Sequence, residues 1–254
     1  MATIVTGYFQ LEKSKASHDK YTDWMKNMLI IDNPMVIFCD EISKDLIHEF
    51  RKTKLDKTII IVTKITDFYT YKYYDNFVKH YDMDLEQRVG HTPFLYMIWN
   101  EKSHFLKRAI ELDPFHTDYF IWVDIGCFRI PNTDFLNWPN PSRIEEMKKD
   151  KILLLLVQPF TIDECGCSSL SDLPSFQTAN RIGGTMFGGG KDILLAWHVK
   201  YYSMLEYFIS INRFIGKDQS IMNCVFLLNR RMCDLIGWTA GCKNHWFYIQ
   251  DYLK

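Results

Sequence analysis

An aspartate that ends an apolar run is the residue in this sequence best placed to do chemistry. The stretch YFIWVDIGCFR, residues 119–129, begins with aromatic and β-branched residues that favour a buried strand, and Asp124 follows where that strand should end. A carboxylate in this position is costly unless a metal ion, a ligand hydroxyl or an arginine compensates it. Asp124 could therefore be a ligand-binding group, or a turn residue paired with Arg129. Arg129 could equally be a phosphate contact.

A divalent cation at Asp124 would need further ligands, and two other residues could supply them. Asp40 follows the apolar stretch MVIFC, and His245 lies near the end of the sequence in KNHW. Cations that bridge phosphates prefer carboxylate oxygens and water, and Mn²⁺ also accepts imidazole. A histidine beside a tryptophan is also common as a packed residue at the surface. The sequence leaves both readings of His245 open.

A glycine-rich stretch, GGTMFGGG at residues 183–190, predicts close approach of the backbone to a ligand. It lacks the Ser or Thr that a Walker A motif requires, because Asp192 follows Lys191. It also lies too late in the chain for a dinucleotide-binding fingerprint. We expect a loop that lines a sugar or phosphate site, and the alternative is a turn-rich connection.

The stretch GKDQSIMN contains a third candidate group. Asp218 precedes an apolar helical pattern, so it could be a helix cap. Asp218 or Gln219 could instead hold an acceptor or act as a base near the reacting carbon. The basic residues that could bind a diphosphate are Lys13, Lys15, Lys102, Arg129, Arg181 and Lys243.

Short apolar runs alternate with helical patterns, which predicts an α/β fold with a mostly parallel sheet. In such a sheet, ligands bind beyond the carboxyl ends of the strands, where Tyr8, Asp40 and Asp124 would lie together. The expected strands are residues 3–9, 34–41, 57–65, 119–124 and 152–157. The expected helices are residues 21–28, 43–51, 92–111, 144–149 and 192–213, and a further one that begins near Asp218.

Length and composition favour a single globular domain. The 254 residues are 47% hydrophobic, enough for a sizeable core, and the net charge of -1 argues against a nucleic-acid partner. We expect no secretory leader and no transmembrane segment, because the longest apolar run, ILLLLV, is far shorter than a membrane span. The seven cysteines show no zinc-site spacing, so we expect reduced thiols in a cytoplasmic protein.

The sequence resembles the HtrL/YibB family, whose members look like GT-A glycosyltransferases. The most specific matching stretches are IWNEK and FIWVDIGCFR, and matching segments run in order along nearly the whole chain. The resemblance implies a GT-A-like domain over residues 1–254, with a nucleotide-binding half at about 1–130 and an acceptor half at about 131–254. It implies a nucleotide-sugar donor, with UDP as the expected nucleotide. The acceptor would be a hydroxyl on a glycan, a lipid or a protein.

The resemblance also implies roles for particular residues. GT-A enzymes usually carry an Asp-x-Asp motif whose acids hold Mn²⁺ or Mg²⁺ on the donor diphosphate, and here Asp124 matches the first acid while Gly126 replaces the second. His245 would complete the metal site. Asp218 and Gln219 resemble the catalytic acceptor-side pair. The residues expected to contact the donor are Tyr8, Asp40, Lys102, Asp124, Gly126, Arg129, Gly183 and Gly184.

Two other functions are compatible with these features. Gly126, in place of a second acid, would also suit a pseudoenzyme that binds a nucleotide or a glycan without turnover. A nucleotidyltransferase is the other alternative, but it would need a phosphate-gripping loop near the N-terminus. The stretch TGYFQLEKSKAS contains a single glycine and makes a poor loop of that kind.

Overall fold

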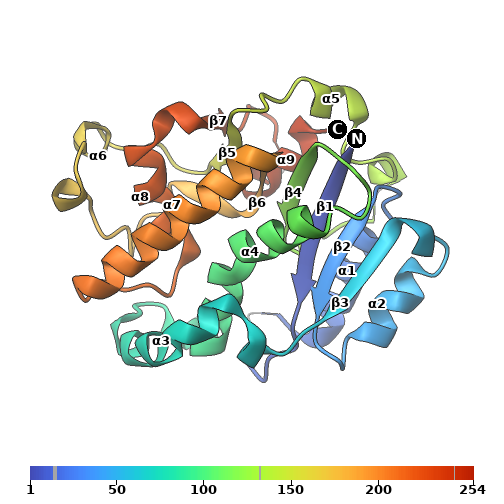
Figure 1. Ribbon diagram of the computed structural model, residues 1–254, viewed down its shortest axis with the longest axis horizontal. Helices are drawn as coiled ribbons and strands as arrows, with labels where there is room; N and C mark the ends of the chain where they lie inside the picture. Colours follow the sequence, from blue (N-terminus) through green and yellow to red (C-terminus); the bar gives the residue numbers. More distant parts are fainter. Residues whose placement is uncertain (14–15, 132, 243) are drawn as a thin grey trace.

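A mixed sheet forms the middle of the molecule (Figure 1). The computed structural model describes residues 1–13, 16–131, 133–242 and 244–254. In these ranges the strands are β1 (Ala2–Tyr8), β2 (Met35–Cys39), β3 (Thr58–Val62), β4 (Tyr119–Val123), β5 (Ile152–Leu156), β6 (Ile182–Gly190) and β7 (Cys233–Gly237). Their order in the sheet is β3-β2-β1-β4-β6-β5-β7, and β6 runs antiparallel to both of its neighbours.

Helices cover both faces of this sheet (Figure 1). The α-helices of the described ranges are α1 (His18–Leu29), α2 (Lys44–Arg51), α3 (Tyr74–His80), α4 (Pro93–Leu112), α5 (Pro141–Glu145), α6 (Ile162–Gly166), α7 (Lys191–Ser210), α8 (Asp218–Leu228) and α9 (Tyr248–Tyr252). The longest, α4 and α7, pack against each other on one face together with α3 and α8. The helices α1, α2, α5 and α9 contribute to the core of the other face.

Alternation along the strands divides the apolar side chains between two cores. Within β4, Phe120 and Trp122 point to the α4 side, whereas Tyr119, Ile121 and Val123 point to the α1 side. Both faces of the strand are therefore buried, as expected for a central strand of a parallel sheet. This arrangement leaves the carboxyl end of β4 as the place where its first polar residue, Asp124, emerges.

The predicted α/β fold with a mostly parallel sheet is confirmed. The expected strands correspond to β1 to β5, and the long predicted helices correspond to α4 and α7. The helix expected at residues 144–149 instead spans Pro141–Glu145, where Asn140 caps its first turn. The proline at the first helical position fits this earlier start.

The prediction that the glycine-rich stretch forms a loop is wrong, because it forms β6 in the middle of the sheet. A Cβ atom built on Gly188 would lie 2.7 Å from the Phe120 carbonyl oxygen. A Cβ on Gly184 would lie 2.6 Å from Asp218 Oδ2. The glycines thus permit close packing of the strand against protein atoms, which a sequence pattern cannot distinguish from close approach to a ligand.

Substitution of Gly188 by alanine is expected to lower the free energy of unfolding by about 1–3 kcal/mol, because the new methyl group would overlap β4 backbone. Urea titration would measure the loss. Gly166→Ala is the matched control, since nothing lies within 4 Å of a Cβ at that helical position. Equal midpoints for the two variants would contradict the tight packing inferred for β6.

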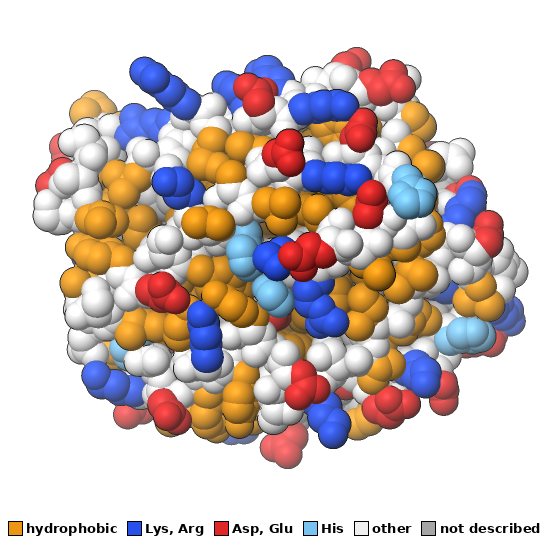
Figure 2. All heavy atoms as spheres, in the orientation of Figure 1, with side chains coloured by type: hydrophobic (Ala, Val, Ile, Leu, Met, Phe, Trp, Pro, Cys, Tyr) orange, Lys and Arg blue, Asp and Glu red, His pale blue; other side chains and the backbone are white. Residues whose placement is uncertain are grey.

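The sequence also predicts free thiols, no membrane span and no extended basic surface. None of the helices in the described ranges has the length and apolar character that a membrane span needs. All seven cysteines are free, and four of them are buried. On the face seen in Figure 2, acidic and basic side chains are interspersed. This pattern gives that face no extended basic surface of the kind that binds nucleic acid.

Candidate functional site

A cavity of about 870 Å³ opens beyond the carboxyl ends of β1 and β4. The segment that follows β1 and the first residues of α1 form one wall, and α4 forms another through Leu95, Ile98, Trp99 and Lys102. The residues after β4, including Asp124 and Arg129, complete the lining. Its position matches the general rule for ligand sites in open α/β sheets.

Asp124 lies in this cavity at the end of its strand. Its Oδ1 accepts hydrogen bonds from Trp122 Nε1 at 2.7 Å and pairs with Lys102 Nζ at 3.1 Å, whereas its Oδ2 is 3.3 Å from Lys102 Nζ. The Asp124 side chain keeps 32% of its surface exposed. Oδ2 is therefore the oxygen with more capacity to accept a bond from a ligand.

Lys102 connects three segments that are distant in the sequence. Its Nζ lies 2.9 Å from Asp218 Oδ2 and donates to the Gly184 carbonyl oxygen at 2.9 Å, in addition to pairing with Asp124. Lys102 is therefore a buried cross-link between α4, β6, α8 and the residue that follows β4.

Burial and neighbouring charges shift the pKa values of Asp124 and Lys102. Burial raises the pKa of the Asp124 carboxyl above its ordinary value, although Lys102 and the Trp122 N–H oppose that shift. Burial alone would lower the pKa of Lys102, but Asp124 and Asp218 outweigh it and hold that pKa above its ordinary value. Lys102 therefore stays a cation, and the charge of the Asp124 carboxylate is costly to keep.

The two predicted catalytic residues lie at the start of α8. Asp218 is buried and absent from the cavity lining, with Oδ1 bonded to the Gln219 N–H and Oδ2 paired with Lys102. Gln219 Nε2 donates to the Ile182 carbonyl oxygen at 3.1 Å. Both side chains thus bond to protein groups in this structure, and their catalytic role stays a prediction.

The stretch IWNEK contains three successive buried polar residues of α4, and each of them bonds to other parts of the protein. Asn100 Nδ2 donates to the carbonyl oxygens of Tyr96 and Ile215, and Glu101 accepts the N–H groups of Tyr69 and Thr70. Lys102 then reaches the cavity. Asn100 and Glu101 were not among the predicted site residues, although adjacent Asn, Glu and Lys inside a strongly apolar helix are a usable signal of buried polar contacts.

Arg129 is at the rim of the cavity and not paired with Asp124. Its guanidinium stacks between Trp24 and Phe247, with ring centres 4.5 and 4.8 Å from Cζ, and its Nε approaches the Gly126 carbonyl oxygen at 3.5 Å. No ion pair joins it to a carboxylate of the described residues. The partner of Asp124 is Lys102, which answers the question that the sequence left open.

Tyr8 and Asp40 lie at the strand edge, as their positions predict, but only Tyr8 lines the cavity. The Tyr8 hydroxyl bonds to His18 Nδ1 at 2.8 Å, and burial raises the pKa of Tyr8 to about 12. Asp40 bonds through Oδ2 to the Gln10 N–H and through Oδ1 to the Ser43 N–H. Asp40 thus fixes the chain after β1 and the entry into α2.

The other predicted residues fall outside the cavity or at its edge. Gly126 lines it, whereas Gly183 packs on the Val157 side chain within β6, and His245 is exposed beside Trp238 and Trp246. Arg181 is paired with Glu164 at 3.0 Å, and Lys13 is exposed. Lys15 and Lys243 lie outside the described residues. The structure therefore brings together Tyr8, Lys102, Asp124, Gly126 and Arg129.

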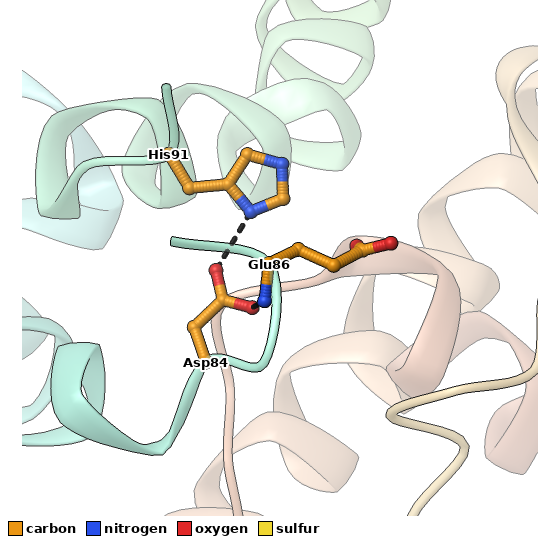
Figure 3. Close-up of side chains that lie close together, drawn as sticks. All are labelled: Asp84, Glu86 and His91. Carbon is orange, nitrogen blue, oxygen red and sulfur yellow. Dashed lines mark hydrogen bonds and ion pairs between the residues drawn. The ribbon is translucent and has the colours of Figure 1, made fainter. Parts of the chain in front are cut away.

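One cluster of three potential metal ligands occurs among the described residues, formed by Asp84, Glu86 and His91 (Figure 3). His91 Nδ1 faces Asp84 Oδ2 at 2.7 Å, and the Tyr96 hydroxyl donates to the same oxygen at 2.5 Å. Asp84 Oδ1 accepts the Glu86 N–H, and the Glu86 carboxylate pairs with Lys217. Protein groups already bond to oxygens of Asp84 and Glu86, so a cation at this partly exposed cluster would have to compete with them.

Two histidines on α4 and α7 make stability depend on pH. The rings of His104 and His198 lie 5.6 Å apart, and burial lowers the pKa of each to about 4. The unfolded chain binds more protons than the folded chain between pH 6.5 and 4, so stability should fall as the pH falls through that window.

Urea titrations at pH 7 and pH 5 would measure this pH dependence. The double variant His104→Gln/His198→Gln is expected to reduce the difference between the two midpoints. His116→Asn, at a position whose side chain is 90% exposed, is the control and should leave the difference unchanged. A difference that persists in the double variant would contradict the assignment.

Comparison with solved structures shows the class of fold. Mouse xyloside xylosyltransferase 1 in its apo form aligns with 100% of this chain and 94% of its own, at a TM-score of 0.50 and 10% sequence identity. The chain is therefore a single α/β domain of the GT-A-like class, as predicted. A diphosphocytidyl-methylerythritol synthase from Anaerococcus prevotii aligns at a TM-score of 0.44 and 7% identity over 99% of this chain and 95% of its own, too distant to bear on the fold.

The chain belongs to the HtrL/YibB family, whose description is "Bacterial protein of unknown function (HtrL_YibB)" and which matches residues 1–249. Protein HtrL of Escherichia coli (strain K12) is 25% identical over 149 residues, which cover 51% of this chain and 52% of that protein. The aligned region thus spans about half the length of that relative. The resemblance expected from IWNEK and FIWVDIGCFR is confirmed at the level of the family.

Proposed function

We propose that this protein is a glycosyltransferase that moves a sugar from a UDP-sugar donor to a hydroxyl group of a glycan, a lipid or a protein. The observation that carries the proposal is the position of Asp124, which faces a large cavity beyond the carboxyl ends of β1 and β4 in a GT-A-like fold. On this proposal, residues up to about 130 bind the nucleotide, and the remainder contacts the acceptor.

The nucleoside would bind among the aromatic residues of the cavity. Tyr8, Tyr21 and Trp24 all line it, and Tyr8 and Tyr21 have ring centres 5.8 Å apart. Aromatic faces of this kind stack on bases. Asp124 Oδ2 would accept a hydrogen bond from a ribose or sugar hydroxyl, since its protein donor is Lys102 at 3.3 Å, whereas Oδ1 accepts from Trp122 Nε1 and also pairs with Lys102.

Cleavage of the bond between sugar and diphosphate places negative charge on the leaving group, so a cation at that position lowers the barrier. Arg129 is the cavity residue suited to this task, because its guanidinium is not in an ion pair with a described carboxylate and can form bidentate bonds to phosphate oxygens. The start of α1, at Ser17 and His18, also lines the cavity, and the N-terminus of a helix attracts the negative charge of a phosphate.

The acceptor-side roles proposed for Asp218 and Gln219 require a rearrangement. A base must reach the hydroxyl proton that it removes. In the structure Asp218 lies behind Lys102 and outside the cavity lining, so it could act only after release from Lys102. Until then its role is to hold Lys102 in place, and Gln219 anchors α8 to β6.

The resemblance implies Mn²⁺ or Mg²⁺, but the residues around Asp124 do not fit a divalent cation. Asp124 already bonds to a lysine ammonium through both oxygens, and neither it nor His245 belongs to a cluster of three ligand groups among the described residues. A metal ion at Asp124 would be repelled by Lys102. The proposed chemistry therefore routes no step through a metal.

Calorimetric titration with UDP, GDP and CMP would test the proposal first, followed by a screen of UDP-sugars for release of UDP. Binding of UDP and acceptor-stimulated release of UDP from one donor would support a transferase. Binding without turnover on any donor and acceptor would favour an inactive binding protein, which Gly126 and the buried position of Asp218 also allow. The absence of binding to all three nucleotides would overturn the proposal.

A further inference from the structure

The charged groups at the end of β4 differ in one respect from a metal-dependent donor site. Both Asp124 oxygens lie within 3.3 Å of Lys102 Nζ, a cation that belongs to the protein. We propose that the cavity binds a nucleoside diphosphate without a divalent cation, and that the Arg129 guanidinium supplies the positive charge at the diphosphate. This inference rests on the proposed function, because it concerns the same cavity.

The first argument is the bonding of Lys102. Its Nζ is buried and within 3.3 Å of both Asp124 oxygens, while Asp218 Oδ2 and the Gly184 carbonyl oxygen hold it from the other side at 2.9 Å. Metal binding would require Lys102 to leave Asp124. Its other partners, Asp218 and Gly184, are buried, so the ammonium would remain attached to them if it left Asp124. Lys102 is thus a protein cation that Asp124 shares with Asp218.

The second argument is the space around Gly126, which replaces the second acid of the expected motif. A Cβ atom at that position would lie 3.1 Å from a Trp24 ring atom and 3.2 Å from a Tyr21 ring atom. These contacts are tighter than normal van der Waals separations. A second carboxylate at this position would therefore require the Tyr21 and Trp24 rings to shift, and the glycine that is present supplies no metal ligand from its side chain.

The third argument is the placement of Arg129. Two aromatic rings, Trp24 and Phe247, hold its guanidinium at the cavity edge, and its Nε is close to the Gly126 carbonyl oxygen. A guanidinium stacked on rings is oriented while its terminal nitrogens keep their donors for a ligand. Lys102 is already shared between Asp124, Asp218 and the Gly184 carbonyl oxygen, so Arg129 is the better of the two cavity cations for a diphosphate.

Isothermal titration of the full chain with UDP tests the inference, in buffer with EDTA and in buffer with MnCl₂. We expect the two dissociation constants to agree within about twofold, and Arg129→Gln to weaken binding by about tenfold or more in both buffers. Arg143→Gln is the matched control, because Arg143 is a surface residue paired with Glu146 and stacked on Tyr252. It should bind UDP like the unaltered protein.

The possible outcomes separate the inference from the proposed function. Binding that appears only with MnCl₂ would overturn the inference and leave the transferase proposal intact. Equal binding by Arg129→Gln and the unaltered protein would overturn the role of Arg129. No UDP binding in either buffer would overturn both. The comparison of buffers uses the unaltered chain, so it stands even where Arg129→Gln does not fold.

Discussion

Replacement of Lys102 by methionine is expected to lower the free energy of unfolding by about 3–5 kcal/mol, the cost of removing one member of a buried ion cluster. Methionine fills a similar volume but leaves Asp124 and Asp218 close together with no cation between them. It also leaves the Gly184 carbonyl oxygen without its donor. The loss should therefore exceed that of any single exposed ion pair in the molecule.

Urea titration at pH 7 measures this effect, with Lys107→Met as the matched control. Lys107 lies on the same helix and pairs with Glu111, whose side chain is 56% exposed, so its loss should be small. Addition of Asp218→Asn to Lys102→Met should recover part of the stability, because one of the two unpaired charges is removed. Similar losses for the two single methionine variants would show that the buried cluster does not stabilise the fold.

The strands that consist of continuous apolar runs could be predicted from the sequence, but the glycine-rich strand β6 could not. Runs such as ILLLLV are continuous because both faces of β5 are buried, and that pattern is distinctive. The β6 sequence IGGTMFGGG has few side chains to form any pattern. Its conformation depends on β4 and β5 on either side, which are contacts made at long range in the chain.

In the candidate site, too, the sequence predicts positions along the chain but not contacts between distant segments. Position at the end of a strand is enough to select Asp124 and Tyr8, because parallel strands end at one edge of the sheet. The pairing of Lys102 with Asp124 and Asp218 was not predictable, since it joins groups 22 and 116 residues apart in sequence through the packing of α4 and α8. The same pattern selected Asp40, whose oxygens turn out to bond to backbone N–H groups.

Substitution of Asp124 by asparagine is expected to reduce transfer from a UDP-sugar on the order of 100-fold or more while the protein stays folded. Lys102 would keep Asp218 and the Gly184 carbonyl oxygen as partners, and the asparagine oxygen could still accept the Trp122 N–H. Burial already raises the pKa of Asp124, so removal of its charge also relieves an unfavourable desolvation.

Release of UDP and the urea midpoint, measured on the same preparation, distinguish the two roles of Asp124. A folded variant without turnover would place Asp124 in the chemistry. A variant that unfolds, or one that keeps turnover, would make Asp124 a structural residue that ends β4. Lys102→Met should therefore lower stability, whereas Asp124→Asn should lower transfer. The lysine stabilises two acids, but the aspartate is one of three partners for the lysine. This difference between the two variants follows from the position of Lys102 between the carboxylates. Asp124 faces the cavity, whereas Asp218 is buried behind the lysine.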